Sequence, residues 1–139
     1  MIVDSKGDVA ELKKMVDKRG FLVEFMNAPD LPAGMKEFAQ IYVATLVPGA
    51  VRGNHYHKHK FEWVSAVAGK IRMIVENVGT AKRTEITLDS GAETVRRFCI
   101  RPGEAHAFEN VSDGTAVLVV YTNKVYDPAT PDTYEHKLL

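Results

Sequence analysis

Three histidines and a glutamate lie within eight residues of one another, at His55, His57, His59 and Glu62. His55 and His57 are two positions apart, so on an extended strand their side chains point to the same face. His106 follows a Pro-Gly turn about forty residues later. If the two stretches lie side by side, His55, His57, Glu62 and His106 offer three nitrogens and one oxygen to a single point. This ligand set predicts one divalent transition metal, and zinc, manganese, iron, nickel and cobalt all remain candidates.

From residue 38 onward, aromatic and β-branched runs alternate with turn residues at intervals of about ten residues. Strands separated in this way favour an antiparallel sandwich or a small barrel. No stretch after residue 38 has helical periodicity. The predicted strands cover residues 38–47, 63–68, 71–76, 83–88, 95–101, 105–110 and 115–122.

The N-terminal part allows two interpretations. Residues 9–16 form a short helix by propensity alone, but the turn at 17–20 is followed by a β-rich run at 21–26, which favours a hairpin. Residues 27–37 contain two prolines and a glycine and predict a loop. We therefore expect one all-β domain over residues 1–139. Its parts are an N-terminal arm at 1–37, a barrel core at 38–122 and a Pro-punctuated C-terminal wrap at 123–139.

Composition limits the partners of the chain. The 139 residues carry 18 basic and 18 acidic side chains, interspersed, for a formal net charge of zero. This balance predicts neither nucleic acid nor a membrane surface as a partner. The single cysteine, Cys99, excludes an intrachain disulfide and suits a reducing cytosol. The first seven residues lack the pattern of a signal peptide and no 18-residue apolar run occurs, so we expect a soluble, cytoplasmic protein.

The spacing of the metal candidates resembles the two motifs of the cupin superfamily. Residues 49–69 read Gly-x5-His-x-His-x4-Glu-x6-Gly, which fits the first motif at every defined position. Residues 103–110 read Gly-x2-His-x3-Asn and fit the second, although its usual Pro-x-Gly is Arg-Pro-Gly here. The resemblance implies a double-stranded β-helix, or jelly-roll barrel, with the metal ligands inside the barrel mouth.

Three ordered landmarks narrow the resemblance. They are Asp-x-Arg-Gly-x3-Glu at 17–24, Val-Arg-Gly-Asn-His-Tyr-His at 51–57 and Val-Tyr-Asp-Pro at 125–128. They resemble the dTDP-4-dehydrorhamnose 3,5-epimerases and the dTDP-sugar 3,4-ketoisomerases. They are closer still to the cupin domain at the C-terminus of some capsular-polysaccharide nucleotide-sugar reductases. The resemblance implies an isomerase that transfers protons next to the ketone of a 4-keto nucleotide sugar, in polysaccharide or deoxysugar biosynthesis.

The resemblance also assigns binding residues. Arg19 and Glu24 match positions that reach the nucleotide held by a neighbouring subunit, which implies a homodimer. Leu22 stands between them where an aromatic residue is usual. Arg52 matches the arginine beside the catalytic histidine, where a guanidinium can hold phosphate or a sugar oxygen. Arg52 and Asn54 are therefore the further substrate-binding candidates.

Two departures change the chemistry implied by the epimerases. His55 matches their catalytic base, but His57 replaces a glutamine and Glu62 stands at the position of the catalytic lysine. A metal-ligand set thus replaces a metal-free acid–base site. Such a metal stabilises the oxyanion that forms when a proton leaves the carbon beside a ketone. His55 cannot act as a free base while its nitrogen binds metal.

Three other residues are candidates for proton transfer. Tyr121 is the first choice, although it fits the family position only with a one-residue gap, and Tyr56 and His59 are the alternatives. The simpler interpretation of each tyrosine is an amphipathic barrel residue, and that of His59 is an exposed loop residue. Two other functions remain open: a metal-dependent oxygenase or oxidase, and a non-catalytic sugar- or metal-binding module.

Overall fold

The computed structural model describes residues 8–35 and 38–139. The prediction that the first seven residues form no signal peptide lies outside this range, as do the last two residues of the predicted loop at 27–37. Within it, the chain forms antiparallel strands and one three-residue 3₁₀ turn, η1 (Ala28–Asp30). No helix in the described part of the chain is long and apolar enough to cross a membrane.

The hairpin prediction for the N-terminal part is confirmed, and the helical alternative is wrong. β1 (Val9–Asp17) pairs antiparallel with β2 (Gly20–Val23), and Asp17 lies opposite Gly20 at the turn. Gly20 has a φ of 134°, which favours glycine over residues with a side chain. β1 also pairs with β8. Tertiary pairing on both edges of β1 therefore overrides its helical propensity.

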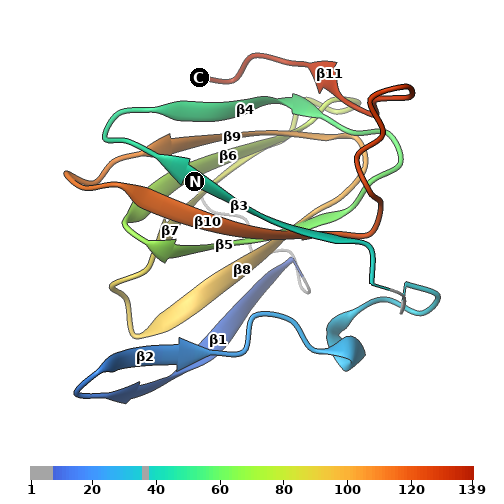
Figure 1. The fold of residues 1–139 in the computed structure, drawn as a ribbon. Coiled ribbons are helices and arrows are strands. Elements are labelled where there is room, and N and C mark those ends of the chain that lie inside the picture. The colour runs from blue at the N-terminus through green and yellow to red at the C-terminus, as the bar shows by residue number, and fades with distance from the viewer. Residues whose placement is uncertain (1–7, 36–37) are drawn as a thin grey trace.

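The strands predicted from residue 38 onward are confirmed. They form two sheets, with the orders β2-β1-β8-β5-β10-β3 and β11-β4-β9-β6-β7, and every pairing is antiparallel. Figure 1 shows both sheets curling around a common interior, with the β1–β2 hairpin at the end opposite β4 and β11. The remaining strands are β3 (Gln40–Leu46), β4 (Val51–Tyr56), β5 (Glu62–Ala68), β6 (Lys70–Asn77), β7 (Arg83–Asp89), β8 (Thr94–Ile100), β9 (Glu104–Asn110), β10 (Ala116–Thr122) and β11 (Tyr134–Glu135).

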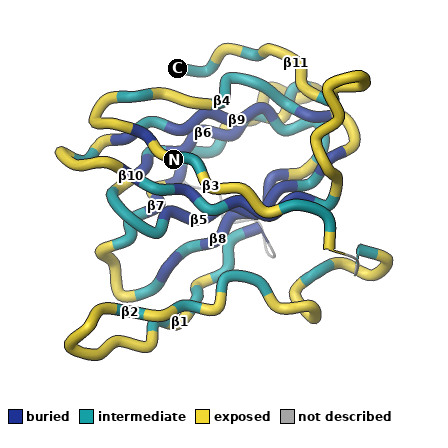
Figure 2. Tube along the Cα trace, viewed as in Figure 1, coloured by how far each residue is buried: buried dark blue, intermediate teal, exposed yellow. Residues whose placement is uncertain are grey.

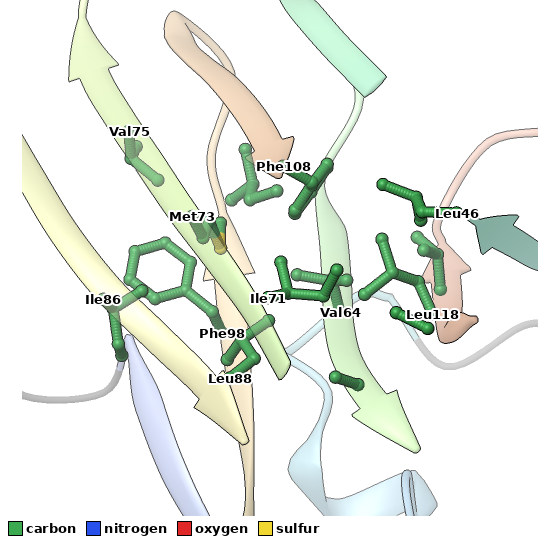
Figure 3. Close-up of a cluster of buried hydrophobic side chains, with 14 residues drawn as sticks. Leu46, Val64, Ile71, Met73, Val75, Ile86, Leu88, Phe98, Phe108 and Leu118 are labelled. Atoms are coloured by element: carbon green, nitrogen blue, oxygen red, sulfur yellow. The ribbon is translucent and has the colours of Figure 1, made fainter. Parts of the chain in front are cut away.

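The main core lies between the two sheets. Alternate residues of β3 and of β5 to β10 point inward, and the inward positions are mostly Val, Ile, Leu, Met and Phe. Figure 3 shows Ile71, Met73 and Val75 of β6 packing toward Val64 and Phe98 of the opposite sheet. Figure 2 shows how burial is distributed along the chain, with buried inner strands and exposed turns.

A smaller apolar cluster lies on the outer face of the six-stranded sheet. Trp63, Cys99 and Tyr121 are its buried members. Phe25, Met26, Leu31 and Met35, from the segment after β2, pack against them together with Phe61. The N-terminal arm therefore covers part of the outer face of the barrel.

The C-terminal wrap lies against β4, a contact that the sequence did not predict. β11 pairs with the end of β4, with Tyr134 opposite Tyr56 and Glu135 opposite His55. His136 contributes Nε2 to a 2.8 Å contact with Glu76 Oε2. The tail thus supplies the edge strand of the five-stranded sheet, next to the histidine motif.

Candidate metal centre

The backbone of β4 brings two of the histidines together. His55 lies opposite His106 of β9, and the register of this pair shifts between Gly53 and His55. Gly53 has a φ of 94°, and a Cβ there would lie 2.7 Å from the carbonyl oxygen of His106. Asn54 also has a positive φ, of 59°. This irregularity lets β4 approach β9 closely, so that His55 and His106 meet at one point.

The structure brings the predicted ligands together. His55, His57 and His106 each offer a ring nitrogen, and these three atoms lie within 4.8 Å of one another. Glu62, the first residue of β5, places Oε1 at 3.1 Å from His57 Nε2 and at 3.3 Å from His106 Nε2. Donor atoms that share an ion at about 2.1 Å lie roughly 3 Å apart when they are adjacent. The Glu62 contacts match that spacing.

Backbone carbonyls orient two of the rings. The Nδ1 atom of His57 lies 2.5 Å from the carbonyl oxygen of Asp132, and that of His106 lies 3.0 Å from the carbonyl oxygen of Glu104. A carbonyl oxygen only accepts hydrogen bonds, so each Nδ1 carries the proton. In a neutral imidazole the Nε2 atom then presents a lone pair. Both lone pairs point at the same carboxylate of Glu62.

Two lone pairs facing a carboxylate oxygen require positive charge between them, either as protons on the rings or as a metal cation. Fixing Nδ1 on a backbone carbonyl is how proteins orient metal-ligating histidines. The donor set, three imidazoles and one carboxylate, suits a borderline first-row cation. The residues present therefore fit a divalent metal ion.

Electrostatics indicate the protonation states of the other two residues, His55 and Glu62. Burial, with the charges of His106 and His57, lowers the pKa of His55 to about 4, which leaves this imidazole neutral at pH 7. Burial alone would raise the pKa of Glu62, but contacts with His106 and His57 outweigh it and hold this pKa well below its usual range. A neutral His55 and an ionised Glu62 are the forms that bind metal.

A cavity of about 190 Å³ opens onto this centre. His55 and His106 line it, whereas His57 and Glu62 do not. Its other lining residues are Tyr42, Ala44, Arg52, Gly53, Phe108, Leu118 and Val120. A ligand in the cavity would therefore meet two of the histidines, one arginine and one tyrosine between apolar walls.

Tyr42 is the residue that the sequence analysis missed. Its hydroxyl donates a 2.8 Å hydrogen bond to Glu62 Oε2. Burial of the hydroxyl and the nearby Glu62 carboxylate raise the pKa of Tyr42 above its ordinary value, so the phenol stays protonated. The available signal was strand parity: Tyr42, Ala44 and Leu46 alternate along β3, and the last of these is a core residue. Strand parity predicts that Tyr42 faces the interior, but it does not predict that its side chain lies beside the histidines.

The three proton-transfer candidates lie elsewhere. Tyr121 is on the outer face of β10, where its ring centroid lies 5.6 Å from that of Trp63. Tyr56 stacks on Tyr134 of the C-terminal wrap, at 5.3 Å. His59 is exposed and lines a different cavity, beyond the turn that follows β4. None of the three lines the histidine cavity. Tyr121 and Tyr56 face away from the interior of the barrel, and His59 lies past the end of β4.

The substrate-binding candidates are divided. Arg52 lines the histidine cavity, and its Nε donates to the carbonyl oxygen of Thr45 at 2.9 Å. Asn54 instead holds the C-terminus, because its Oδ1 accepts from the backbone N–H groups of Leu138 and Leu139. Arg19 pairs with Asp17 at the turn of the β1–β2 hairpin, at 2.6 Å.

Glu24 follows that hairpin and is exposed, with its Oε1 3.3 Å from Asn27 Nδ2. The β1–β2 hairpin lies at the opposite end of the molecule from β4 (Figure 1). Arg19 and Glu24 therefore lie far from the histidines of their own chain.

Comparison with known proteins places these features in a family. A family model described as the polysaccharide biosynthesis C-terminal domain matches residues 15–134. A UDP-2-acetamido-2,6-beta-L-arabino-hexul-4-ose reductase of Pseudomonas aeruginosa is 34% identical over 119 residues, which cover 85% of this chain and 29% of the reductase.

Solved structures agree on the fold. The capsular polysaccharide assembling protein CapF of Staphylococcus aureus matches with 29% identity and a TM-score of 0.69, over 91% of this chain and 34% of CapF. This chain thus spans about a third of the length of both CapF and the reductase.

A dTDP sugar isomerase of Desulfovibrio desulfuricans matches with 15% identity and a TM-score of 0.81, over 93% of this chain and 82% of the isomerase. At this identity the likeness concerns the fold alone. Together with the all-β sheets it confirms the predicted double-stranded β-helix. The chain is a cupin-fold member of the polysaccharide biosynthesis C-terminal domain family.

Proposed function

We propose that this chain binds one divalent transition-metal ion through His55, His57, His106 and Glu62, and acts as an epimerase or ketoisomerase on a 4-keto nucleotide sugar. The observation that carries the proposal is the orientation of the ligands. Backbone carbonyls hold the Nδ1 atoms of His57 and His106, and both Nε2 atoms converge on Glu62 beside an open cavity.

The choice of substrate is supported by the family and by the name of the curated relative. The family description refers to polysaccharide biosynthesis. The Pseudomonas aeruginosa relative is named for a UDP-linked hexul-4-ose, a sugar with a ketone at carbon 4. Because this chain spans 29% of that protein, we transfer to it the substrate class and not the reduction.

The cavity supplies the other groups that such a reaction needs. A divalent cation held by these ligands would supply Lewis-acid stabilisation to a ketone oxygen, while water in the open cavity takes the proton that leaves the neighbouring carbon. The Nε of Arg52 donates a hydrogen bond to the carbonyl oxygen of Thr45, and its terminal nitrogens have no partner among the described residues. These nitrogens are available for a phosphate or sugar oxygen.

Tyr42 replaces Tyr121 as our choice for proton transfer. Its hydroxyl is protonated and lies in the cavity, hydrogen-bonded to Glu62. A protonated phenol in this position would return a proton to the substrate carbon, which is the second half of an epimerisation or ketoisomerisation, and the phenolate would then regain its proton from solvent.

Solvent exchange tests the proposal. We expect the metal-loaded chain to incorporate deuterium from heavy water into a UDP- or dTDP-linked 4-keto-6-deoxyhexose at the carbon beside the ketone, as measured by mass spectrometry. Tyr42→Phe should slow the exchange by roughly 10²- to 10⁴-fold. Tyr121→Phe is the matched control and should retain the normal rate, since Tyr121 lies on the outer face of the sheet.

Other outcomes would favour the other functions. Binding of the sugar without exchange would contradict the isomerase and indicate a non-catalytic binding module. Oxygen consumption by the metal-loaded chain would favour an oxidase or oxygenase.

We further propose a homodimer in which the β1–β2 hairpin reaches the site of a second copy. Arg19 and Glu24 are exposed and lie far from the histidines of their own chain, so a substrate role for them requires a neighbour. Light scattering should give twice the mass of the chain, and a monomer would remove that role.

A further inference from the structure

A second cavity lies where the C-terminal wrap passes the turn between β4 and β5. Figure 1 shows residues 124–133 running beside this turn, and Asp132 hydrogen-bonds to the turn directly. The cavity has a volume of about 260 Å³ and includes His59, Lys60, Lys124 and Tyr126 in its lining. Pockets for drug-sized ligands begin at about 300 Å³, so this cavity suits a small group and not a whole nucleotide sugar.

Lys60 is the unusual residue of this cavity. Its side chain is buried, with 8% of the residue exposed. No carboxylate or other hydrogen-bonding group of the described residues contacts its ammonium, and the one hydrogen bond of this residue outside the sheets is donated by its backbone N–H to Asp132. A buried cation without a counter-charge is costly to a fold.

The acidic residues that line the cavity are already engaged. The Asp132 carboxylate accepts hydrogen bonds from the backbone N–H groups of residues 58, 59 and 60. The Asp127 carboxylate accepts from the Ala129 N–H and the Thr130 hydroxyl. Lys124, which is exposed, has no ion pair among the described residues either. Two lysines and two aspartates line the cavity, so its formal charge is zero, but both carboxylates have hydrogen-bond donors and the Lys60 ammonium has no hydrogen-bonding partner among the described residues. An anion in the cavity would supply that partner.

We propose that this cavity binds a phosphate group, with Lys60 as its principal charged contact and Lys124 and His59 as weaker ones. The site itself follows from the charge and burial of these residues. The identity of the phosphate as the diphosphate of a nucleotide sugar rests on the function proposed above. Free phosphate has the same chemistry, so the experiment separates the two sources.

Calorimetry on the intact chain tests the site, with UDP, inorganic pyrophosphate and uridine as separate probes and equal metal content in every variant. Uridine should not bind measurably. Lys60→Met should weaken UDP binding by roughly tenfold or more, because a buried charge-assisted contact is lost. Lys124→Met should weaken it by roughly two- to fivefold, since this charge is exposed.

A thermal readout keeps the test independent of folding defects. Lys60→Met removes a buried unpaired charge, so the ligand-free variant should melt at a higher temperature than the parent, while the rise caused by UDP should disappear. Lys82→Met is the matched control: Lys82 is exposed in the β6–β7 turn, outside the lining of this cavity. It should leave both the melting temperature and UDP binding unchanged.

The outcomes separate the two proposals. Tight UDP binding and weak pyrophosphate binding, both dependent on Lys60, support a nucleotide-sugar diphosphate, and equal binding supports a free oxyanion. UDP binding that is equally strong in Lys60→Met and Lys82→Met overturns the site. Lys60-dependent binding without deuterium exchange leaves the phosphate site standing and contradicts only the isomerase.

Discussion

Glu62 and Trp63 are neighbours in β5, and each is almost completely buried, with 3% and 4% of the residue exposed. Glu62 faces the interior, where it meets His57 and His106. Trp63 faces outward and packs in the cluster with Tyr121 and Cys99. The same burial thus serves a polar centre on one face of the sheet and plain packing on the other.

The inner and outer faces of the sheet differ in how their polar atoms are arranged. In the histidine centre, several lone pairs converge on one point and require a cation or protons between them. In the outer cluster, burial and then Glu104 raise the pKa of the Cys99 thiol to about 12, which leaves it protonated and unreactive. Convergence of donor atoms therefore marks the functional face better than burial does.

The largest effect should come from removing a ligand on the inner face. In His106→Ala we expect metal content to fall to background, because the variant removes one of the three imidazole ligands and the contact that it makes with Glu62. Elemental analysis after dialysis measures this. His136→Ala is a suitable control, since His136 pairs with Glu76 outside the centre. Full metal content in His106→Ala would contradict the ligand assignment.

Trp63→Ala should affect stability and spare the metal. Truncating a buried aromatic residue costs about 3–5 kcal/mol of unfolding free energy, measured by urea denaturation. Metal content should remain that of the parent. Loss of metal in Trp63→Ala would show that the two faces of the sheet are coupled.

Acid should destabilise the metal-free chain through the inner face. The pKa of His55 is about 4 in the folded chain and about 6.5 in an unfolded one. The unfolded chain therefore binds more protons between these values, and the free energy of unfolding falls as the pH drops from about 6.5 to about 4. We expect a loss of about 2–3 kcal/mol, seen in urea titrations across this range. His55→Phe should flatten the profile, and an unchanged slope would exclude His55 as the cause.

Asp132→Ala should have the smallest effect of the four. The variant removes the acceptor of three backbone N–H groups in the turn after His57 and loosens the carbonyl that orients this ring. We expect metal affinity to fall by roughly tenfold, measured by competition with a chromogenic chelator. Asp113→Ala, in the exposed β9–β10 turn, should not change it. Unaltered affinity in Asp132→Ala would show that the wrap does not position His57.

Much of the fold could be predicted from local sequence. Turn residues at regular intervals and alternating apolar positions predict the strands, because each strand buries one face and each turn needs particular backbone conformations. The spacing of His55, His57 and Glu62, with His106 after its own turn, predicts their convergence. These features depend on short stretches of chain, so the sequence alone contains them.

The remainder depended on contacts between distant segments. Tyr42 reaches Glu62 from another strand, and Asp132 reaches His57 across 75 positions. Tyr121 and Tyr56 were candidates for proton transfer because they lie near the motifs in the sequence. Strand parity places Tyr121 on the outer face, and Tyr56 stacks on Tyr134 of the C-terminal wrap, so neither reaches the cavity. The sequence by itself determined the strands and the spacing of the candidate ligands within each motif, because both are local patterns. Only the tertiary structure decided which side chains surround those ligands, since that depends on sheet order, register and the path of the tail.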